Sequence, residues 1–450
     1  MPRRRGNPAN LAGDKFFMKL NIRRLAGFCA ISSLLLSGPA WAEDWPQWRG
    51  PERTGHAAPA AAVPATLPKE LKPEWKIAIG GGFSSPVLAE GKLVYLDENG
   101  TREVVHVLEA GTGRELWRAE YADLFKDEWG AGPRSTPIID HDRLYVQSCN
   151  GELRCFRLAD GHLLWQVGVE KDFGVKFLGG KAREGTATRR GNNGCGVIDG
   201  QRFIVPVGGT NGASLVCFDK MTGRVQWKSG NDEAAYSSCM VATLAGVRQV
   251  IAFNADALLG ANLETGNILW RVPLVTNAKR HAATPVIFGD HVVVNSHTIG
   301  MVCFRIVSEN GALQAKPAWV NKKLAINLAT PVLVGEFLYC LGAQKDFVCV
   351  EAATGKLRWS RPGFGHGNKD YAAAIVLGSK LLVLTESGEL VLLEANPDNG
   401  LELGRLQVCG STWSHPAYGH GKLFVRDGRQ LLSLDLTGPP AEGNPKPEIR

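Results

Sequence analysis

Several common catalytic signatures are missing from this sequence. It has no glycine-rich phosphate-binding loop between a strand and a helix, no Gly-x-Ser-x-Gly elbow in that context and no His-Glu-x-x-His pair. Methionine is also scarce, with five in 450 residues, whereas there are 53 glycines and 12 tryptophans. This balance favours many tight turns and argues against a helical bundle.

Paired cysteines are lacking as well. No two cysteines are adjacent, and no pair has the spacing of zinc ligands. Some of them instead share one position in successive repeats, which other repeats fill with small or aliphatic residues. The cysteines are Cys155, Cys217, Cys303 and Cys349, and the other residues are Val107, Ala261, Leu392 and Ser433. We interpret this position as core packing rather than as a chemical site.

The basic charge is concentrated at the N-terminus. Residues 1–24 contain seven basic residues and one acidic residue, and the remainder of the chain has 44 basic and 43 acidic residues. A nucleic-acid partner is therefore not expected, because no large basic face remains. Residues 1–42 are predicted to be a signal peptide, with a probable start at Met18, an apolar run over 25–36 and cleavage after Ala42. The mature protein is expected to be periplasmic or secreted, with no transmembrane segment.

A turn followed by tryptophan recurs along the chain. In each copy the tryptophan follows the turn glycine by four residues, as in Thr222-Gly223-Arg-Val-Gln-Trp227. Three short β-patterned runs precede each turn, so each repeat predicts a four-stranded antiparallel sheet. The tryptophans of these motifs are Trp117, Trp165, Trp227, Trp270 and Trp359, and we interpret them as scaffold residues that pack on a neighbouring sheet.

The repeats predict an all-β, eight-bladed β-propeller. Eight first strands are found, but the last repeat has only three strands, and residues 74–79 supply the missing fourth. Pairing between the two ends closes the ring and removes an exposed edge. The predicted domains are a strap over 43–71, the propeller over 72–437 and a flexible tail over 438–450. A stacked-strand solenoid is the alternative fold, although its repeats would be shorter.

Two local departures from the repeat are expected. An insertion over 171–191 forms the one basic stretch of the mature chain, either as a solvated loop or as a contact for an acidic partner, a polysaccharide or a phospholipid surface. In the seventh repeat Gly404 stands where tryptophan is expected.

The Thr-Gly-x-x-x-Trp turns resemble the repeats of the pyrroloquinoline-quinone (PQQ)-like propeller family, which includes quinoprotein dehydrogenases and BamB-like noncatalytic propellers. The segment Asp44-Trp-Pro-Gln-Trp-Arg-Gly-Pro51 resembles the start of secreted bacterial members of this family. The resemblance covers nearly the whole mature chain. It implies the propeller fold, whereas one fold hosts many functions.

Residues just before each first strand are expected to surround one mouth of the central channel. They combine polar, aromatic and basic groups, which is typical of a ligand site, or alternatively of a polar channel that holds water. The candidate binding residues are Arg134, Asn193, Tyr236, His281, Asn327, Tyr371, Trp413 and His415. Phe83, Asn192, Lys279, Arg280 and Asp370 lie at the same positions.

The resemblance raises the question of a quinone cofactor. PQQ with calcium would need an aromatic platform, cations for its carboxylates, oxygen ligands for the metal and a carboxylate base. Trp413 is the candidate platform, and Arg134 with Lys279 or Arg280 are the candidate cations. Acids are sparse, since Asp370 is the only one directly beside a first strand and Asp232 and Glu233 lie further away. The adjacent-cysteine pair of many quinoprotein alcohol dehydrogenases is absent, so no cofactor is expected.

We therefore expect a monomeric, noncatalytic binding or assembly scaffold. Its partner would be an envelope protein or a small-molecule ligand at the channel mouth. A PQQ-dependent oxidoreductase acting on an alcohol or a sugar is the alternative. A hydrolase with two carboxylates also remains open, because propeller sites combine residues from distant blades.

Overall fold

A computed structural model gives the fold of this chain. The structure describes residues 43–59, 61–122, 124–127, 129–175, 191–277, 279–365 and 371–437. The predicted signal peptide and C-terminal tail, most of the basic insertion and Asp370 lie outside these residues. The described residues all belong to one compact unit, Pro39–Arg450.

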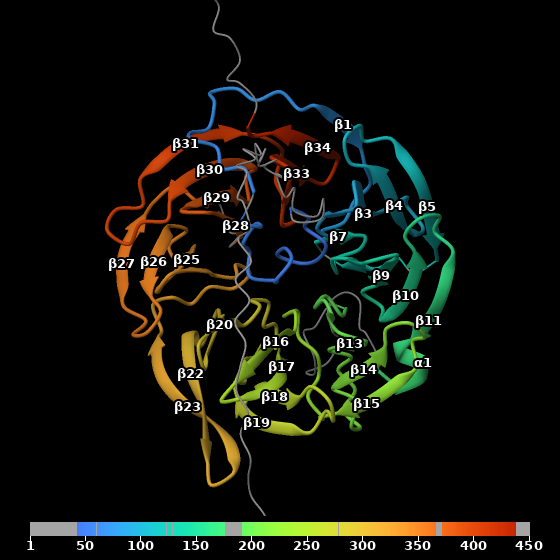
Figure 1. The fold of residues 1–450 in the computed structure, drawn as a ribbon, viewed down its shortest axis with the longest axis vertical. Coiled ribbons are helices and arrows are strands. Elements are labelled where there is room, and N and C mark those ends of the chain that lie inside the picture. Colours follow the sequence, from blue (N-terminus) through green and yellow to red (C-terminus); the bar gives the residue numbers. More distant parts are fainter. Residues whose placement is uncertain are drawn as a thin grey trace, which may run out of the picture. The chain divides into compact units, whose positions relative to one another are not determined.

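Eight four-stranded antiparallel sheets form a ring of blades (Figure 1). The prediction of an eight-bladed propeller is confirmed, and the solenoid alternative is wrong. Blades 1 to 4 consist of β2 (Val87–Ala89), β3 (Lys92–Glu98), β4 (Glu103–Glu109) and β5 (Glu115–Tyr121); β8 (Ile138–Asp140), β9 (Arg143–Gln147), β10 (Glu152–Arg157) and β11 (Leu163–Gly168); β12 (Val197–Asp199), β13 (Arg202–Val205), β14 (Leu215–Asp219) and β15 (Val225–Ser229); and β16 (Met240–Leu244), β17 (Val247–Phe253), β18 (Ala257–Asn262) and β19 (Ile268–Pro273).

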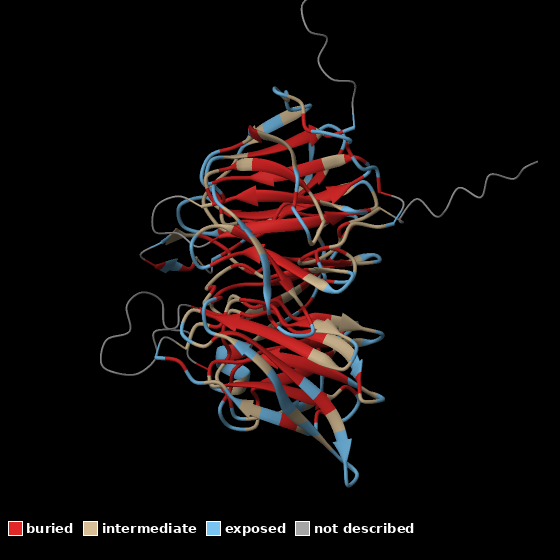
Figure 2. Cartoon of the chain, turned by 90° about the vertical axis from the view of Figure 1, so that its left-hand side faces the viewer, coloured by how far each residue is buried: buried red, intermediate tan, exposed pale blue. Residues whose placement is uncertain are grey.

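The second half of the ring repeats the same strand order. Blades 5 to 8 consist of β20 (Val286–Phe288), β21 (His291–Ser296), β22 (Gly300–Glu309) and β23 (Ala312–Asn321); β24 (Val332–Val334), β25 (Phe337–Leu341), β26 (Phe347–Glu351) and β27 (Leu357–Arg361); β28 (Ala372–Leu377), β29 (Lys380–Thr385), β30 (Glu389–Glu394) and β31 (Glu402–Gln407); and β32 (Ala417–Gly419), β33 (Lys422–Arg426) and β34 (Gln430–Asp435) with β1 (Trp75–Ala78). Figure 2 shows that most strands are buried along much of their length, whereas many connecting loops are exposed.

The two ends of the propeller meet in blade 8. Strand β1 pairs antiparallel with β34, from Trp75 opposite Ser433 to Ala78 opposite Gln430. The backbone N–H of Glu74 also donates to the carbonyl of Ser433, at 2.9 Å. The sheet begun near the C-terminus is therefore completed by a strand from the N-terminal part of the chain.

Outer-strand tryptophans join neighbouring blades. The indole N–H of Trp117 in blade 1 donates to the carbonyl of Leu158 in blade 2 at 2.9 Å, and its ring covers Gly161. Gly161 has φ +73°, a backbone conformation that residues with a side chain rarely adopt. The indole of Trp117 also leaves no room for a Cβ at this position. The same arrangement holds for Trp75, Trp165, Trp227, Trp319 and Trp359.

Trp270 is an exception to the predicted docking. Its indole N–H donates to Gln249 Oε1 of its own blade at 2.6 Å. Gly260 stands opposite Trp270, at the position that the sequence analysis assigned to Ala261. A Cβ at Gly260 would collide with Trp270 Nε1. The indole folds onto this glycine because the next blade has a long β22–β23 hairpin instead of a Thr-Gly turn. Figure 1 shows that hairpin projecting from the ring.

Gly404 has a related explanation. The blade that follows it is closed by the two ends of the propeller, so no third-to-fourth-strand turn is present for a tryptophan to cover. The strap occupies this place, since a Cβ at Gly404 would lie 2.8 Å from the Cβ of Leu67. Both exceptions therefore result from the form of the next blade.

The repeated cysteine position lies behind the docking tryptophans. Cys155, Cys217, Cys303 and Cys349 pair with tryptophans of the outer strands at a β-bulge. All four are 0–1% exposed, as are Val107, Leu392 and Ser433 at the same position and Ala261, which lies one residue beyond it. These thiols fill the core next to the indoles.

Side chains at the starts of the first strands link the blades around the channel. Ser84 Oγ donates to the carbonyl of Ser135 in the next blade, and Ser135 Oγ donates to the carbonyl of Asn192 in the one after. Between blades 3 and 4, the backbone N–H of Cys195 donates to Ser238 Oγ at 3.0 Å. Adjacent innermost segments are therefore held in register, which fixes the positions of the residues before them.

Little of the described chain lies outside the blades. Helix α1 (Val169–Phe173) follows blade 2 and contains Lys171 and Asp172 from the start of the basic insertion. Strands β6 (Lys126–Asp127) and β7 (Gly130–Ala131) form a small hairpin between blades 1 and 2. Within the described ranges no helix has the length and apolar character needed to cross a membrane.

Candidate functional site

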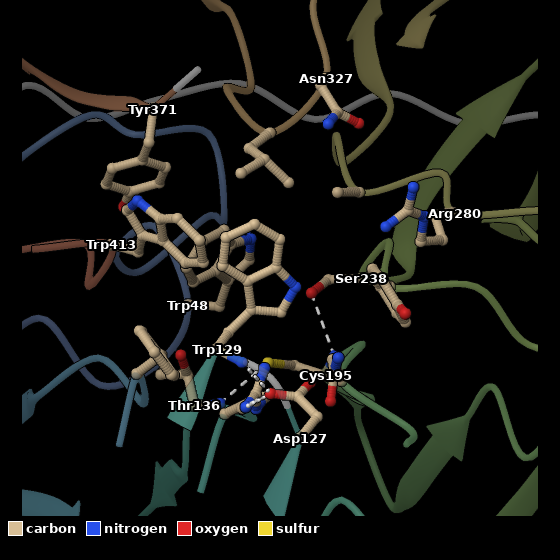
Figure 3. Close-up of a pocket in the computed structure, with 16 residues that line it drawn as sticks. Trp48, Asp127, Trp129, Thr136, Cys195, Ser238, Arg280, Asn327, Tyr371 and Trp413 are labelled. Carbon is tan, nitrogen blue, oxygen red and sulfur yellow. Dashed lines mark hydrogen bonds and ion pairs between the residues drawn. The ribbon is translucent and has the colours of Figure 1, made fainter. Parts of the chain in front are cut away.

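A cavity of about 250 Å³ occupies one mouth of the central channel. Each of the eight blades contributes a residue from the segment before or at the start of its first strand, and the β6–β7 hairpin and the strap add others (Figure 3). The lining residues are Trp48, Phe83, Asp127, Trp129, Arg134, Thr136, Asn193, Cys195, Tyr236, Ser238, Arg280, Ala282, Asn327, Leu328, Tyr371 and Trp413.

Six of the eight residues predicted from the sequence line this pocket. They are Arg134, Asn193, Tyr236, Asn327, Tyr371 and Trp413. The structure thus brings together residues from blades 2, 3, 4, 6, 7 and 8. Their predicted role in binding remains a prediction.

His281 and His415 do not line the pocket. His281 is fully buried, stacks on Phe253 with ring centroids 4.0 Å apart, and bonds through Nε2 to the carbonyl of Leu274. Its neighbours Arg280 and Ala282 face the pocket instead, as expected where successive side chains point to opposite sides. His415 lies under the strap and stacks on Trp45. Burial lowers the pKa of each histidine to about 4.

The pocket has aromatic walls. The rings of Phe83 and Trp413 have centroids 5.3 Å apart, and those of Trp129 and Trp413 have centroids 5.4 Å apart. The Trp129 side chain is 48% exposed, which is unusual for a large aromatic residue that is part of a cluster. These rings offer flat apolar surface at the opening of the channel.

Trp129 stands on a rigid support. The β6–β7 hairpin is held by Asp127, whose Oδ1 accepts the N–H of Trp129 at 2.9 Å and Arg134 Nη2 at 2.7 Å. The Arg134 guanidinium also lies over the ring of Phe83, 4.8 Å from its centroid. The sequence analysis missed Trp129 and Asp127 because this hairpin lies between two repeats and has no equivalent among the described residues.

The strap forms the floor of the pocket. Residues 44–57, which we call the plug, lie inside the ring of first strands (Figure 1), and Trp48 faces the cavity. Hydrogen bonds or ring contacts join the plug to all eight blades. In blade order from 1 to 8, its contacts are with Leu88, Ile139, Cys195, Cys239, Thr284, Pro331, Val376 and His415.

Two arginines of the plug are buried beneath the pocket. Arg49 Nη2 donates to the carbonyls of Pro331 and Thr54, at 2.6 and 3.1 Å. Arg53 donates to the carbonyls of Cys239 and Cys195 and to Gln47 Oε1. No carboxylate of the described residues forms an ion pair with either guanidinium. Burial, together with the nearby Arg53, lowers the pKa of Arg49 to about 9, so Arg49 remains largely cationic at neutral pH.

The other predicted cations and acids have different environments. Arg280 lines the pocket and has no ion-pair partner among the described residues, whereas Lys279 pairs with Asp256 at 3.1 Å. Asp232 pairs with Arg271 and Glu233 lies 4.0 Å from Lys279, and neither acid is among the residues that line the cavity. Asp127 is the only carboxylate among the described lining residues, and Arg134 holds it.

This set of side chains does not fit PQQ held by calcium. Calcium takes six to eight oxygen ligands, preferably including carboxylates. Asp127 and Asn327 lie on opposite sides of the pocket in Figure 3, and the described residues contain no group of three His, Cys, Asp or Glu side chains that could hold a metal. All nine described cysteines are free, so no disulfide faces the pocket.

The fold and the pocket define a class of protein: an eight-bladed, tryptophan-docked β-propeller with a plugged central channel. Similar folds are found in solved structures. BamB from Moraxella catarrhalis has a TM-score of 0.54 and 14% identity over 81% of this chain and 98% of that chain. Quinohemoprotein alcohol dehydrogenase ADHIIG from Pseudomonas putida HK5 has a TM-score of 0.59 and 11% identity over 91% and 82%. At such identities the likeness concerns the fold alone.

Sequence comparison gives the family. A family model described as outer membrane protein assembly factor BamB matches residues 68–192 and 101–361. The outer membrane protein assembly factor BamB of Shewanella oneidensis is 21% identical over 369 residues, which cover 79% of this chain and 87% of the relative. The chain belongs to this BamB-like family of PQQ-like propellers.

Proposed function

We propose that this protein is a noncatalytic binding or assembly scaffold of the bacterial envelope that acts as a monomer. The observation that carries the proposal is the composition of the channel mouth. Its described lining is rich in aromatic rings and guanidinium groups, and its single carboxylate is held by Arg134. General acid–base catalysis needs a titratable group free to exchange a proton with a substrate, whereas binding needs apolar surface and fixed polar groups.

The relationship to assembly factors supports the same proposal. The family model and the relative from Shewanella are both described as outer membrane protein assembly factor BamB. The predicted signal peptide over 1–42 supports export to the periplasm or beyond. The plug and the docked tryptophans provide a rigid ring, which suits a scaffold that presents one face to a partner.

Capture of envelope proteins tests this function. Tagged protein is incubated with an envelope extract, cross-linked and purified, and its partners are identified by mass spectrometry. We expect at least one envelope protein to be captured by the wild type and lost with Trp129→Ala combined with Arg280→Gln. The control is Leu116→Ala combined with Arg358→Gln, because these exposed residues lie on outer strands of blades 1 and 6. Equal capture by both double variants would exclude the mouth as the contact surface.

A PQQ-dependent oxidoreductase is the second candidate, because the dehydrogenase from Pseudomonas putida shares the fold over most of this chain. Its test is direct. Purified protein is mixed with PQQ and calcium, and quinone absorbance and reduction of an artificial electron acceptor are followed. The scaffold proposal expects no uptake at tens of micromolar. Uptake that gives dye reduction and is abolished by Trp413→Ala would reverse the order of the two candidates.

A further inference from the structure

The pocket contains features that a contact with a protein surface alone does not require. Its cavity of about 250 Å³ extends down to Trp48 of the plug. Arg49 and Arg53 of the plug are buried and do not line the cavity; they donate to backbone carbonyls and to Gln47 but form no ion pair with a described carboxylate. Arg280, in the wall of the pocket, is a third guanidinium without an ion-pair partner among the described residues. Buried charge is costly unless it is compensated, so this end of the channel favours an anion.

The shape of the walls restricts what the anion can be. Phe83, Trp129 and Trp413 form a cluster of rings, and Trp48 lies at the floor. Aromatic faces stabilise flat apolar surfaces that lie against them. A small inorganic anion would leave these faces without a partner, whereas a ring of five or six atoms would cover them.

Tyr371 adds a donor on the other side of the pocket. It is 6% exposed, and its hydroxyl has no hydrogen-bond partner among the described residues. Burial raises the pKa of Tyr371, so the hydroxyl keeps its proton. Arg280 and Tyr371 lie on opposite sides in Figure 3. A ligand that uses both residues therefore carries its negative charge at one end and an oxygen acceptor at the other.

The supports of the pocket are already in place. Asp127 fixes both Arg134 and the backbone of Trp129, and the indole N–H of Trp48 donates to Thr284 Oγ1 at 3.0 Å. Fixed side chains lose little conformational freedom on binding, which increases affinity. Trp129, Arg134 and Trp48 therefore need no rearrangement before a ligand enters, whereas the buried hydroxyl of Tyr371 becomes reachable from the cavity only when its side chain shifts.

We propose that the pocket binds a small ring-shaped molecule that carries one carboxylate, with the ring against Trp129 and Trp413, the carboxylate toward Arg280 and an oxygen substituent toward Tyr371. This chemistry is shared by hydroxylated aromatic acids and by uronic acids. The inference goes beyond the scaffold function, because it concerns a small ligand and does not depend on a protein partner.

Binding of two acids and their neutral counterparts tests the proposal. Isothermal titration calorimetry and tryptophan fluorescence are recorded with 4-hydroxybenzoate, 4-hydroxybenzamide, glucuronate and glucose. We expect one of the acids to bind with a dissociation constant below about 1 mM and at least tenfold more tightly than its neutral counterpart. The acid that binds identifies the source as aromatic or saccharide. Failure of both acids at several millimolar would overturn the proposal, as would equal affinity for an acid and its counterpart.

Variants separate the roles of the side chains. Arg280→Gln should weaken the binding acid at least tenfold and leave the weak affinity for the neutral counterpart unchanged. Trp129→Ala should weaken both, and Tyr371→Phe should weaken the acid several-fold. Arg358→Gln on the outer strand β27 is the matched control and should change nothing, since Arg358 pairs with Asp398 away from the pocket. Unchanged affinity in Arg280→Gln would contradict the assignment. Envelope capture can fail while the acid still binds, so the two proposals are tested separately.

Discussion

The indole of Trp75 covers Gly113, so the strand that completes blade 8 also joins that blade to blade 1. The Trp75 N–H donates to the carbonyl of Ala110 at 3.0 Å, and a Cβ at Gly113 would lie 2.8 Å from the indole. Trp75 is at the same time paired with Ser433 in β34. One residue therefore contributes both to the closure within blade 8 and to the contact between blades 8 and 1.

Substitution of Gly113 should weaken this closure. Gly113→Ala places a methyl group against the ring and forces a residue with φ +72° to carry a Cβ, so we expect a loss of about 2 kcal/mol or more in the free energy of unfolding. Gly111→Ala is the control, because no atom lies within 4 Å of its added Cβ and its φ is not positive. Urea titration followed by tryptophan fluorescence measures both. Equal stability of the two variants would contradict the docking role of Gly113.

The plug should be a major source of stability rather than a loose strap. Trp45 is 1% exposed, exchanges backbone hydrogen bonds with Leu88 and stacks on His415. Trp45→Ala should lower the free energy of unfolding by about 3 to 5 kcal/mol, as large buried aromatic residues do when truncated.

The matched comparison for Trp45 is Trp129→Ala, the same substitution at a tryptophan that is 48% exposed. It should change stability by less than about 1 kcal/mol. Chemical denaturation of both variants at pH 7.5 gives the two values. A Trp45 variant as stable as the Trp129 variant would mean that the plug adds little to the fold.

Most of the fold was predictable because it repeats. The recurring Thr-Gly-x-x-x-Trp turn predicts the positions of the blades. The count of strands predicts that residues 74–79 pair with the last strand, and the pairing of Trp75 with Ser433 confirms this. Segments before the first strands recur at one mouth, so residues as far apart as Arg134 and Trp413 were correctly placed near each other. These inferences needed only local pattern and ring symmetry.

The parts that were not predictable break the symmetry. Trp129 belongs to a hairpin found once in the described part of the chain, and the position of the plug depends on contacts with eight distant segments. His281 and Arg280 are neighbours in sequence, yet only Arg280 faces the cavity, because side-chain direction depends on a register that the sequence does not reveal. His415 lies deeper than Trp413 because the plug covers it.

Stability should decrease in mild acid because of the buried histidines. Burial, reinforced by the Arg49 guanidinium, lowers the pKa of His415 to about 4, whereas the unfolded value is about 6.5. Between these values the unfolded chain binds more protons than the folded chain. The contribution of neutral His415 to the free energy of unfolding is therefore fully present above pH 6.5 and is lost as the pH falls toward 4.

A variant isolates this effect. His415→Gln should lose about 2 kcal/mol less stability than the wild type between pH 7.5 and pH 4.5, since each pKa unit corresponds to about 1.4 kcal/mol. Urea titrations at the two pH values measure the difference, and His162→Gln at an exposed turn is the control. Parallel losses in the wild type and His415→Gln would assign the acid sensitivity to other groups.

The cysteines should remain unreactive thiols in the native protein. All nine described cysteines are buried and free, and burial raises the pKa of Cys217, Cys239 and Cys303 to about 12. A thiolate is the reactive form, so protonation and lack of access act in the same direction. Titration of a chain that starts at residue 43 with an aromatic disulfide reagent should therefore label none of the nine thiols in buffer and all nine in guanidinium chloride.

An engineered thiol calibrates that experiment. Leu357→Cys, at a side chain that is 44% exposed on β27, should react once in buffer. Cys195 provides the sharper test, because it lines the pocket although it is only 4% exposed, and its Sγ accepts the N–H of Thr136 at 3.2 Å. Rapid labelling of the wild type that disappears in Cys195→Ser would show that the reagent reaches the bottom of the pocket. It would contradict the inaccessibility expected of a thiol that is only 4% exposed.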